Sequence, residues 1–192
     1  MSETEKTLKP GIRTSSAKQR TLLAVFTLLI ALFVILLSAR CTPKEGKIIG
    51  YGDRAPGFSL QALDGKTVSL ADFRGKVILV HFWATWCPPC VEEMPALEQF
   101  ARSIRAKDFQ ILAVSVDEGG AAAVAAFMQK NGLSIPVLLD PSRSIAKLYG
   151  TFKFPETYVI DRQGVVRDKA IGPRDWTVPS NTSIIRQLLE AG

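Results

Sequence analysis

Hydrophobic and polar positions follow two different patterns along this chain. From Thr21 to Ala39 the chain runs for 19 residues without a charged side chain. At ~1.5 Å rise per residue, a helix of that length reaches about 28 Å, close to the thickness of a bilayer core. A buried core helix would show polar positions at helical spacing, whereas residues 22–37 contain only Thr27. The pattern predicts a single transmembrane helix over residues 21–39.

Basic residues orient this segment. Five Lys or Arg residues precede the span and four follow it by residue 54, a modest positive-inside bias that predicts a cytoplasmic basic segment over residues 1–20. An uncleaved anchor is favoured over a removed signal, whose apolar centre is shorter. Cys41 is open to three interpretations: a spectator thiol, a lipid attachment site despite Arg40, or an intermolecular partner.

Composition and charge characterise the chain beyond the span. Apolar residues make up 47% and charged residues 22% of the 192 residues, close to the average of globular proteins, so a disordered or collagen-like chain is excluded. The net charge is +6, but the first 47 residues hold eight basic and three acidic residues, which leaves the rest nearly neutral. A nucleic-acid-binding surface is therefore excluded. Residues 40–51 are predicted to be a linker, and residues 52–192 one domain.

Strand and helix patterns alternate within this domain. Asp64-Gly65 lies between two short alternating runs and predicts an opening β-hairpin. Val77–Phe82 is a continuous apolar run typical of a buried strand, and Val91–Ala106 has helical spacing. Further strands are expected at 109–116, 137–139, 157–160 and 165–171, and further helices at 122–130, 142–149 and 180–190. This order predicts an α/β sandwich whose sheet is mainly parallel with an antiparallel edge.

Candidate chemistry is concentrated in Trp86-Cys87-Pro88-Pro89-Cys90, directly after the buried strand. A cysteine at a helix amino terminus meets unpaired N–H groups and the positive end of the helix dipole, which favour thiolate. Cys87 is therefore the predicted nucleophile. Cys90 lies one turn further on, within reach of a mixed disulfide on Cys87, and is the predicted resolving thiol. Pro88 and Pro89 occupy a first turn that tolerates missing N–H groups, and stiffen the loop.

Two simpler interpretations of this cysteine pair are weaker. Half of a zinc site needs a second pair of ligands, and the rest of the chain offers only Cys41 and His81. An inert structural disulfide across two residues gains little stability, because it closes a very short loop. Redox chemistry with no metal and no cofactor is the prediction.

The stretch VILVHFWATWCPPC, residues 77–90, resembles the active-site strand and helix start of the thioredoxin superfamily. More narrowly, the chain is similar to the membrane-anchored TlpA/ResA/CcmG-type thiol–disulfide oxidoreductases over residues 52–190. Residues 55–60 with Gly65 match their opening hairpin, and residues 155–161 match a later strand. Residues 117–140 resemble the strand–helix insertion that distinguishes this group. The resemblance implies a thioredoxin-like three-layer sandwich.

The resemblance also assigns residues around the thiols. Pro155 matches the cis-proline that faces the cysteines, and this would leave the backbone of Phe154 free to pair with an extended substrate segment. Trp86 should line the exposed rim together with Pro88 and Pro89. Glu156 is a candidate for substrate choice, with a solvated loop position as an equal alternative.

Two residues are candidate proton acceptors for Cys90. Glu93 falls three residues after Cys90, where the extracytoplasmic relatives carry a glutamate; a solvated residue on the helix face is the alternative. His81, the single histidine of the chain, stands where simple thioredoxins have a buried aspartate. A hydrogen-bonded core histidine is the more common role at such a position. The acid–base assignment stays open between these two residues.

The resemblance implies an enzyme of the bacterial cytoplasmic membrane whose catalytic domain faces the periplasm or the extracellular side. It would reduce disulfides in client proteins, apocytochrome c or a copper-site protein being the typical ones, and be recharged by a membrane electron donor of the DsbD/CcdA type. A disulfide-donating oxidase or isomerase on the same fold is the alternative. A copper-site chaperone, the weaker alternative, would need a C-x-x-x-C motif and a distant histidine, whereas this chain has two spacer residues and its one histidine in the active-site strand. A peroxidase would need a catalytic cysteine followed by Thr or Ser and outside any C-x-x-C pair.

Overall fold

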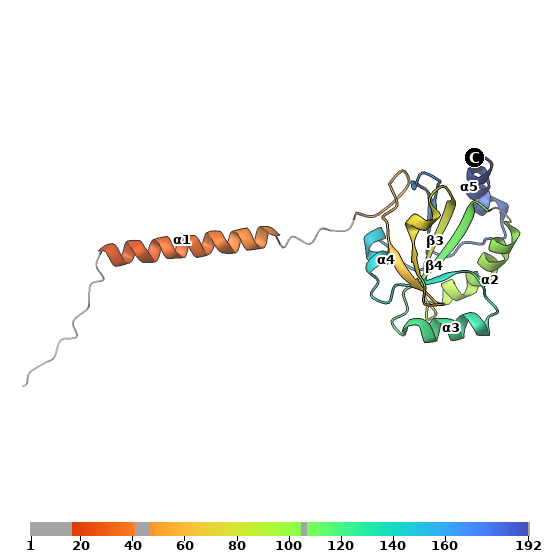
Figure 1. Ribbon diagram of the computed structural model, residues 1–192, viewed down its shortest axis with the longest axis horizontal. Coiled ribbons are helices and arrows are strands. Elements are labelled where there is room, and N and C mark those ends of the chain that lie inside the picture. Colours follow the sequence, from red (N-terminus) through yellow and green to blue (C-terminus); the bar gives the residue numbers. More distant parts are fainter. Residues whose placement is uncertain (1–16, 41–46, 105–106, 192) are drawn as a thin grey trace, which may run out of the picture. The chain divides into compact units, whose positions relative to one another are not determined.

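The computed structural model describes residues 17–40, 47–104 and 107–191 (Figure 1). The chain divides into two units, Met1–Glu45 and Gly46–Gly192. The first contains helix α1 (Ala17–Arg40), whose large apolar side chains between Leu22 and Phe33 are exposed. Within the described residues, no helix combines the length and the apolar character that a membrane crossing requires. Cys41, residues 1–16 of the expected basic segment and residues 41–46 of the expected linker lie outside the described residues.

The second unit is built on a seven-stranded sheet with the order β2-β1-β5-β4-β3-β6-β7. The strands are β1 (Ser59–Ala62), β2 (Thr67–Ser69), β3 (Val77–Trp83), β4 (Phe109–Ser115), β5 (Val137–Leu139), β6 (Glu156–Ile160) and β7 (Val166–Ile171). The helices are α2 (Pro88–Ser103), α3 (Gly120–Lys130), α4 (Ser144–Tyr149) and α5 (Pro179–Glu190), with a short 3-10 turn at Leu70–Phe73. Each element predicted for the domain is therefore present.

The prediction of a mainly parallel sheet is wrong. Only the β3–β4 and β4–β5 pairs are parallel, while β1–β2, β1–β5, β3–β6 and β6–β7 are antiparallel. The reason is that α2 and α3 are the two crossover connections that return the chain in the same direction. After β5 the chain passes through α4 and enters β6 on the far side of β3, running the opposite way.

Helices cover both faces of the sheet, as the resemblance implied. On one face Tyr149 of α4 packs against Phe82 and Tyr158, with ring centroids 5.4 and 5.1 Å apart. On the other face Phe127 of α3 packs against Trp83 at 5.3 Å. Figure 1 shows α4 on one side of the sheet, and α2 and α3 on the other. The domain is thus a three-layer thioredoxin-like sandwich, with the insertion of α3 and β5 adding a strand between β1 and β4.

The packed domain begins earlier than the expected boundary at residue 52. Ile49 is 6% exposed, and its N–H donates to the carbonyl of Tyr149 at 3.1 Å. Its neighbour Ile48 lies against Gly150, which has φ +70°, and a Cβ there would stand 2.7 Å from the Ile48 Cα. Ile48 and Ile49, which the sequence analysis assigned to the linker, therefore pack on the domain, and we call this segment the strap.

Candidate active site

The two cysteines lie where β3 passes into α2. Cys87 is the N-cap residue of α2 and Cys90 belongs to its first turn. They form a disulfide, with Cα atoms 5.3 Å apart. Cys87 is 5% exposed and Cys90 is fully buried, so Cys87 is the sulfur that a client can approach. This placement agrees with the predicted order of attack.

Two prolines change the hydrogen-bonding potential of this helix start. Pro88 and Pro89 occupy the first two helical positions and carry no N–H. The N–H of Cys87 itself donates back to the carbonyl of Ala84 at 3.2 Å. The N–H of Cys90 is therefore the first one of the helix able to stabilise a thiolate at Cys87, whereas an ordinary helix offers more donors there.

Asp117 holds the turn before Cys87, a role that the sequence analysis missed. Its buried carboxylate accepts hydrogen bonds from the N–H and the hydroxyl of Thr85 at 3.0 and 2.6 Å, and from the hydroxyl of Ser115 at 2.7 Å. Asp117 comes after the end of β4, which runs parallel to β3, so both strands end at the same edge of the sheet. The sequence signal that could have pointed to Asp117 is its place as an acidic residue just after the strand that neighbours β3.

An aromatic rim lies beside the disulfide. Trp86 is 54% exposed and meets the half-buried ring of Phe154 edge to face, at 6.2 Å between centroids. The guanidinium of Arg143, which also pairs with Glu118, lies 5.5 Å from the Trp86 ring centroid. The Phe154–Pro155 peptide bond is cis, as the resemblance implied.

Glu156 fits neither of the two expectations for it, a role in substrate choice or a solvated position in a loop. It is fully buried, with Oε1 2.8 Å from Lys169 Nζ and 2.5 Å from the hydroxyl of Tyr158, which donates to it. Lys169 also donates to the carbonyl of Ile49 at 3.0 Å. A buried carboxylate needs such partners, and they hold it away from any client. Glu156 is thus a buried residue at the start of β6 that supports the preceding loop, which carries Phe154.

His81 and Glu93 meet inside the domain. His81 is fully buried on β3 and Glu93 is 6% exposed on α2, one turn after Cys90. The Nε2 atom of His81 and the Oε1 atom of Glu93 are 3.1 Å apart. The Nδ1 atom of His81 lies 2.9 Å from the hydroxyl of Thr157, and Glu93 Oε2 accepts the N–H of Arg174 at 2.7 Å. The solvated alternative for Glu93 is excluded.

Burial drives both groups toward their neutral forms. It lowers the pKa of His81 to about 3, so the imidazole is neutral at neutral pH. Burial also raises the pKa of Glu93 to about 7, against the opposing effect of the Arg174 N–H and of the neighbouring Trp176 indole. Although the distance is that of an ion pair, the contact joins a neutral imidazole and a carboxyl group poised to gain or lose a proton near pH 7.

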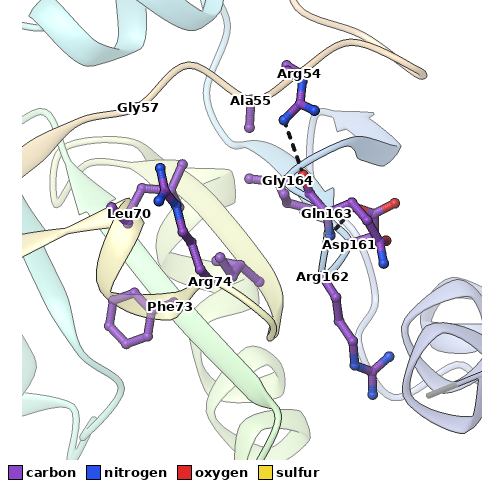
Figure 2. Close-up of a pocket in the computed structure, with 13 residues that line it drawn as sticks. Arg54, Ala55, Gly57, Leu70, Phe73, Arg74, Asp161, Arg162, Gln163 and Gly164 are labelled. Atoms are coloured by element: carbon purple, nitrogen blue, oxygen red, sulfur yellow. Dashed lines mark hydrogen bonds between the residues drawn. The ribbon is translucent and has the colours of Figure 1, made fainter.

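A cavity of about 290 Å³ lies away from this chemistry (Figure 2). It is lined by Ile78, near the start of β3, and by Ile160, near the end of β6, whereas Cys87 comes after the opposite end of β3. Arg54 and Arg74 also line it. No three His, Cys, Asp or Glu side chains of the described residues are grouped as metal ligands would be.

A C-x-x-C disulfide at the start of a helix on this sandwich defines a thioredoxin-like thiol–disulfide oxidoreductase. The chain belongs to the AhpC/TSA family, whose model matches residues 51–169. It is 35% identical to the thiol-disulfide oxidoreductase ResA of Bacillus thuringiensis (strain Al Hakam) over 158 residues, 81% of this chain and 90% of that protein.

Two further comparisons agree with this membership. The thioredoxin-like protein YneN of Bacillus subtilis (strain 168) is 39% identical over 123 residues, 63% of this chain and 71% of that protein. The crystal structure of a thiol:disulfide interchange protein of the thioredoxin family from Chlorobium tepidum TLS is similar with a TM-score of 0.62 and 31% identity. It covers 72% of this chain and 97% of that one.

Proposed function

We propose that this oxidoreductase works as a reductant of disulfides in extracytoplasmic client proteins. The Cys87 thiolate attacks one sulfur of a client disulfide, breaks that bond and forms a mixed disulfide, and the client's other sulfur leaves as a thiolate that takes up a proton. Cys90 then loses its proton and attacks the Cys87 sulfur. The client leaves with two thiols, and two electrons have moved from the enzyme, which keeps the Cys87–Cys90 disulfide.

The prolines of the active-site loop support the proposed direction of electron transfer, from the enzyme to the client. A strong disulfide donor is one whose reduced form is stabilised, chiefly by hydrogen bonds and helix dipole acting on the nucleophilic thiolate. Pro89, at the second helical position, removes one of the two N–H groups that a thiolate at the N-cap residue Cys87 would meet. A less stabilised thiolate gives up its electrons more readily, which favours reduction of clients.

Glu93 supplies the proton acceptor in this scheme. It lies three residues after Cys90 on the same helix, and residues at that spacing share a face. A carboxyl group with a pKa of about 7 accepts the proton of an attacking thiol and returns it without a large energetic penalty at neutral pH. The aromatic rim of Trp86 and Phe154 offers apolar contact to an extended client segment, whose backbone pairs beside Pro155.

Anchoring and partners complete the proposal. The charge-free stretch from Thr21 to Ala39 and the exposed apolar side chains of α1 support attachment of the domain to the outer side of the bacterial cytoplasmic membrane. There the oxidised enzyme would be recharged by a membrane electron donor of the DsbD/CcdA type. The haem-site cysteines of apocytochrome c are the client class that the family resemblance favours, and a copper-site protein is the second.

The equilibrium reduction potential tests this function. The protein is titrated against glutathione and dithiothreitol buffers, with Cys87→Ser and Cys90→Ser as inactive controls. A potential at or below about −220 mV is expected of a reductant, whereas about −120 mV marks a disulfide donor and would reverse the proposed direction. The Cys90→Ser variant should also trap a client segment as a mixed disulfide on Cys87, because nothing resolves it.

A further inference from the structure

The environment of His81 determines which ring nitrogen carries its proton. The Thr157 side chain opposes His81 across the β3–β6 pair and is buried, with 2% of its surface exposed. Among the described residues, its hydroxyl has one hydrogen-bond partner, the Nδ1 atom of His81 at 2.9 Å. A buried hydroxyl needs an acceptor for its proton. The Thr157 hydroxyl therefore donates to Nδ1, and the neutral ring carries its single proton on Nε2.

The Nε2 atom lies next to the carboxyl group of Glu93. Nε2 and Oε1 are 3.1 Å apart, yet within the described part of the chain neither atom has a partner with full hydrogen-bond geometry. Two buried polar atoms facing each other without an aligned bond require an explanation. An aligned bond from Nε2–H would stabilise an ionised Glu93, while a protonated carboxyl gains less from it.

We propose that His81 is a positioning residue: held by Thr157 with its proton on Nε2, it donates to the ionised Glu93 and so keeps this carboxylate available to accept the proton of Cys90. The inference rests on the proposed function, since it concerns the step in which Cys90 resolves the mixed disulfide. His81 itself neither gains nor loses a proton in that step.

The other groups around Glu93 leave this role to His81. On its own helix the buried residue that can titrate and shares the same face is Cys90, three positions earlier. From the segment after β7, the Arg174 N–H donates to Oε2, and the Arg174 guanidinium is occupied by Asp168 Oδ2 at 2.6 Å. The indole N–H of Trp176 lies in the same segment, close to the carboxyl group. His81 is the group that β3 contributes, and Oε1 is the oxygen that it faces.

Nuclear magnetic resonance of the reduced full-length chain gives the first test. Because His81 is the only histidine, ¹⁵N-labelled histidine reports a single ring. The expected spectrum shows a protonated Nε2 and an unprotonated Nδ1 at neutral pH. A protonated Nδ1, or a doubly protonated ring, would overturn the inference. Thr157→Ser should keep this spectrum, and Thr157→Val should change it.

The pKa of Glu93 gives the second test, followed by ¹³C labelling of glutamate and assigned with Glu93→Gln. In His81→Leu it should rise by about one unit, because the carboxylate loses a donor. In His81→Gln, whose side-chain amide can place an N–H near the position of Nε2, it should stay close to that of the unchanged protein. A pKa that is the same in His81→Leu, or that Gln fails to restore in a folded variant, contradicts the inference.

Kinetics connect this geometry to the chemistry. The protein carrying glutathione on Cys87 is mixed at several pH values, and release of glutathione by Cys90 is timed. His81→Leu should resolve about fivefold more slowly at pH 7, with the rise of the profile moved up by about one pH unit, and His81→Gln should behave like the unchanged protein. Equal profiles would overturn the inference. The reduction potential decides the proposed direction separately, so a disulfide donor with the expected profiles refutes the function alone.

Discussion

At the scale of single residues, the loop between the two cysteines determines how strongly the nucleophile is stabilised. The N–H groups of the second and third helical positions are the ones that an N-cap side chain meets. Here the second position is Pro89 and the third is Cys90, so one of these two donors is missing. The identity of residue 89 should therefore influence the chemistry of Cys87 more than that of residue 88.

Replacing Pro89 with Ala should make the protein a weaker reductant. The variant regains an N–H near Cys87, which should lower the pKa of that thiol by about half to one unit and raise the reduction potential by about 10 to 30 mV. Thiol alkylation rates over pH and redox titration measure the two quantities. Pro88→Ala is the matched control, and a larger effect there would contradict the proposed donor geometry.

Glu93 should make the stability of the fold depend on pH. Its pKa in the folded protein, about 7, lies above the ordinary 4.5, so its stabilising contribution is complete below pH 4.5 and is lost as the pH rises through 7. Relative to the unchanged protein, Glu93→Gln should gain about 3 kcal/mol of unfolding free energy between pH 4.5 and pH 8.

Denaturant unfolding at several pH values measures this gain, with the exposed neighbour Glu92 replaced by Gln as the control. His81 acts in the opposite direction, since its pKa is lowered to about 3 and stability is lost as the pH falls from 6.5 toward 3. Because both proteins keep His81, its effect largely cancels in the comparison. If the difference in unfolding free energy between Glu93→Gln and the unchanged protein does not change with pH, Glu93 is not a buried carboxyl group that titrates near pH 7.

At the scale of elements, β6 supplies successive residues to opposite faces of the sheet. Glu156 and Tyr158 face α4, where Tyr158 contacts Tyr149, while Thr157 faces the side of α2 through His81. The cause is the alternation of side chains along any strand. One short strand therefore contributes both to the support of the aromatic rim and to the pair proposed to handle the proton of Cys90.

Removing the positive partner of Glu156 should destabilise the domain. Lys169→Met leaves a fully buried carboxylate without its cation, and breaking such a pair typically costs about 3–5 kcal/mol. The double variant with Glu156→Gln should recover part of this loss, because no uncompensated charge remains. Thermal and denaturant unfolding provide the measurement. The exposed Lys153→Met is the control, and a similar loss there would show that the effect is not that of the pair.

Element positions could be predicted well, because they depend on local periodicity. The predicted strand at 137–139 matches β5, and the other boundaries shift by a few residues. Strand direction could not be predicted to the same degree, since it depends on how β6 enters beside β3, a non-local pairing. Within the site, Cys87 and Cys90 carry a sequence motif, whereas Asp117 and the burial of Glu156 depend on contacts between distant segments.

At the scale of the whole molecule, the strap before β1 belongs to the folded domain. Ile49 inserts into the core and its carbonyl accepts from Lys169, whereas the neighbouring Ile48 side chain is 60% exposed. Ile49→Ala should therefore lower the free energy of unfolding by about 2–3 kcal/mol, by loss of buried apolar volume. Ile48→Ala should change it by less than about 0.5 kcal/mol. Equal effects in denaturant unfolding would place the domain boundary after the strap.

Because side chains of β6 alternate between the two faces, the sheet also separates two groups of ionisable side chains. A fixed charge pair, Glu156 with Lys169, lies on one side, and the titrating carboxyl of Glu93 lies on the other. Among the described residues, the groups that contact or lie close to the Glu93 carboxyl are His81, Arg174 and Trp176, and neither member of the charge pair is one of them. The buried support of the loop that carries Phe154 and the proton transfer proposed for Glu93 thus lie on opposite faces of the sheet, so a substitution at Glu156 should leave the contacts of Glu93 unchanged.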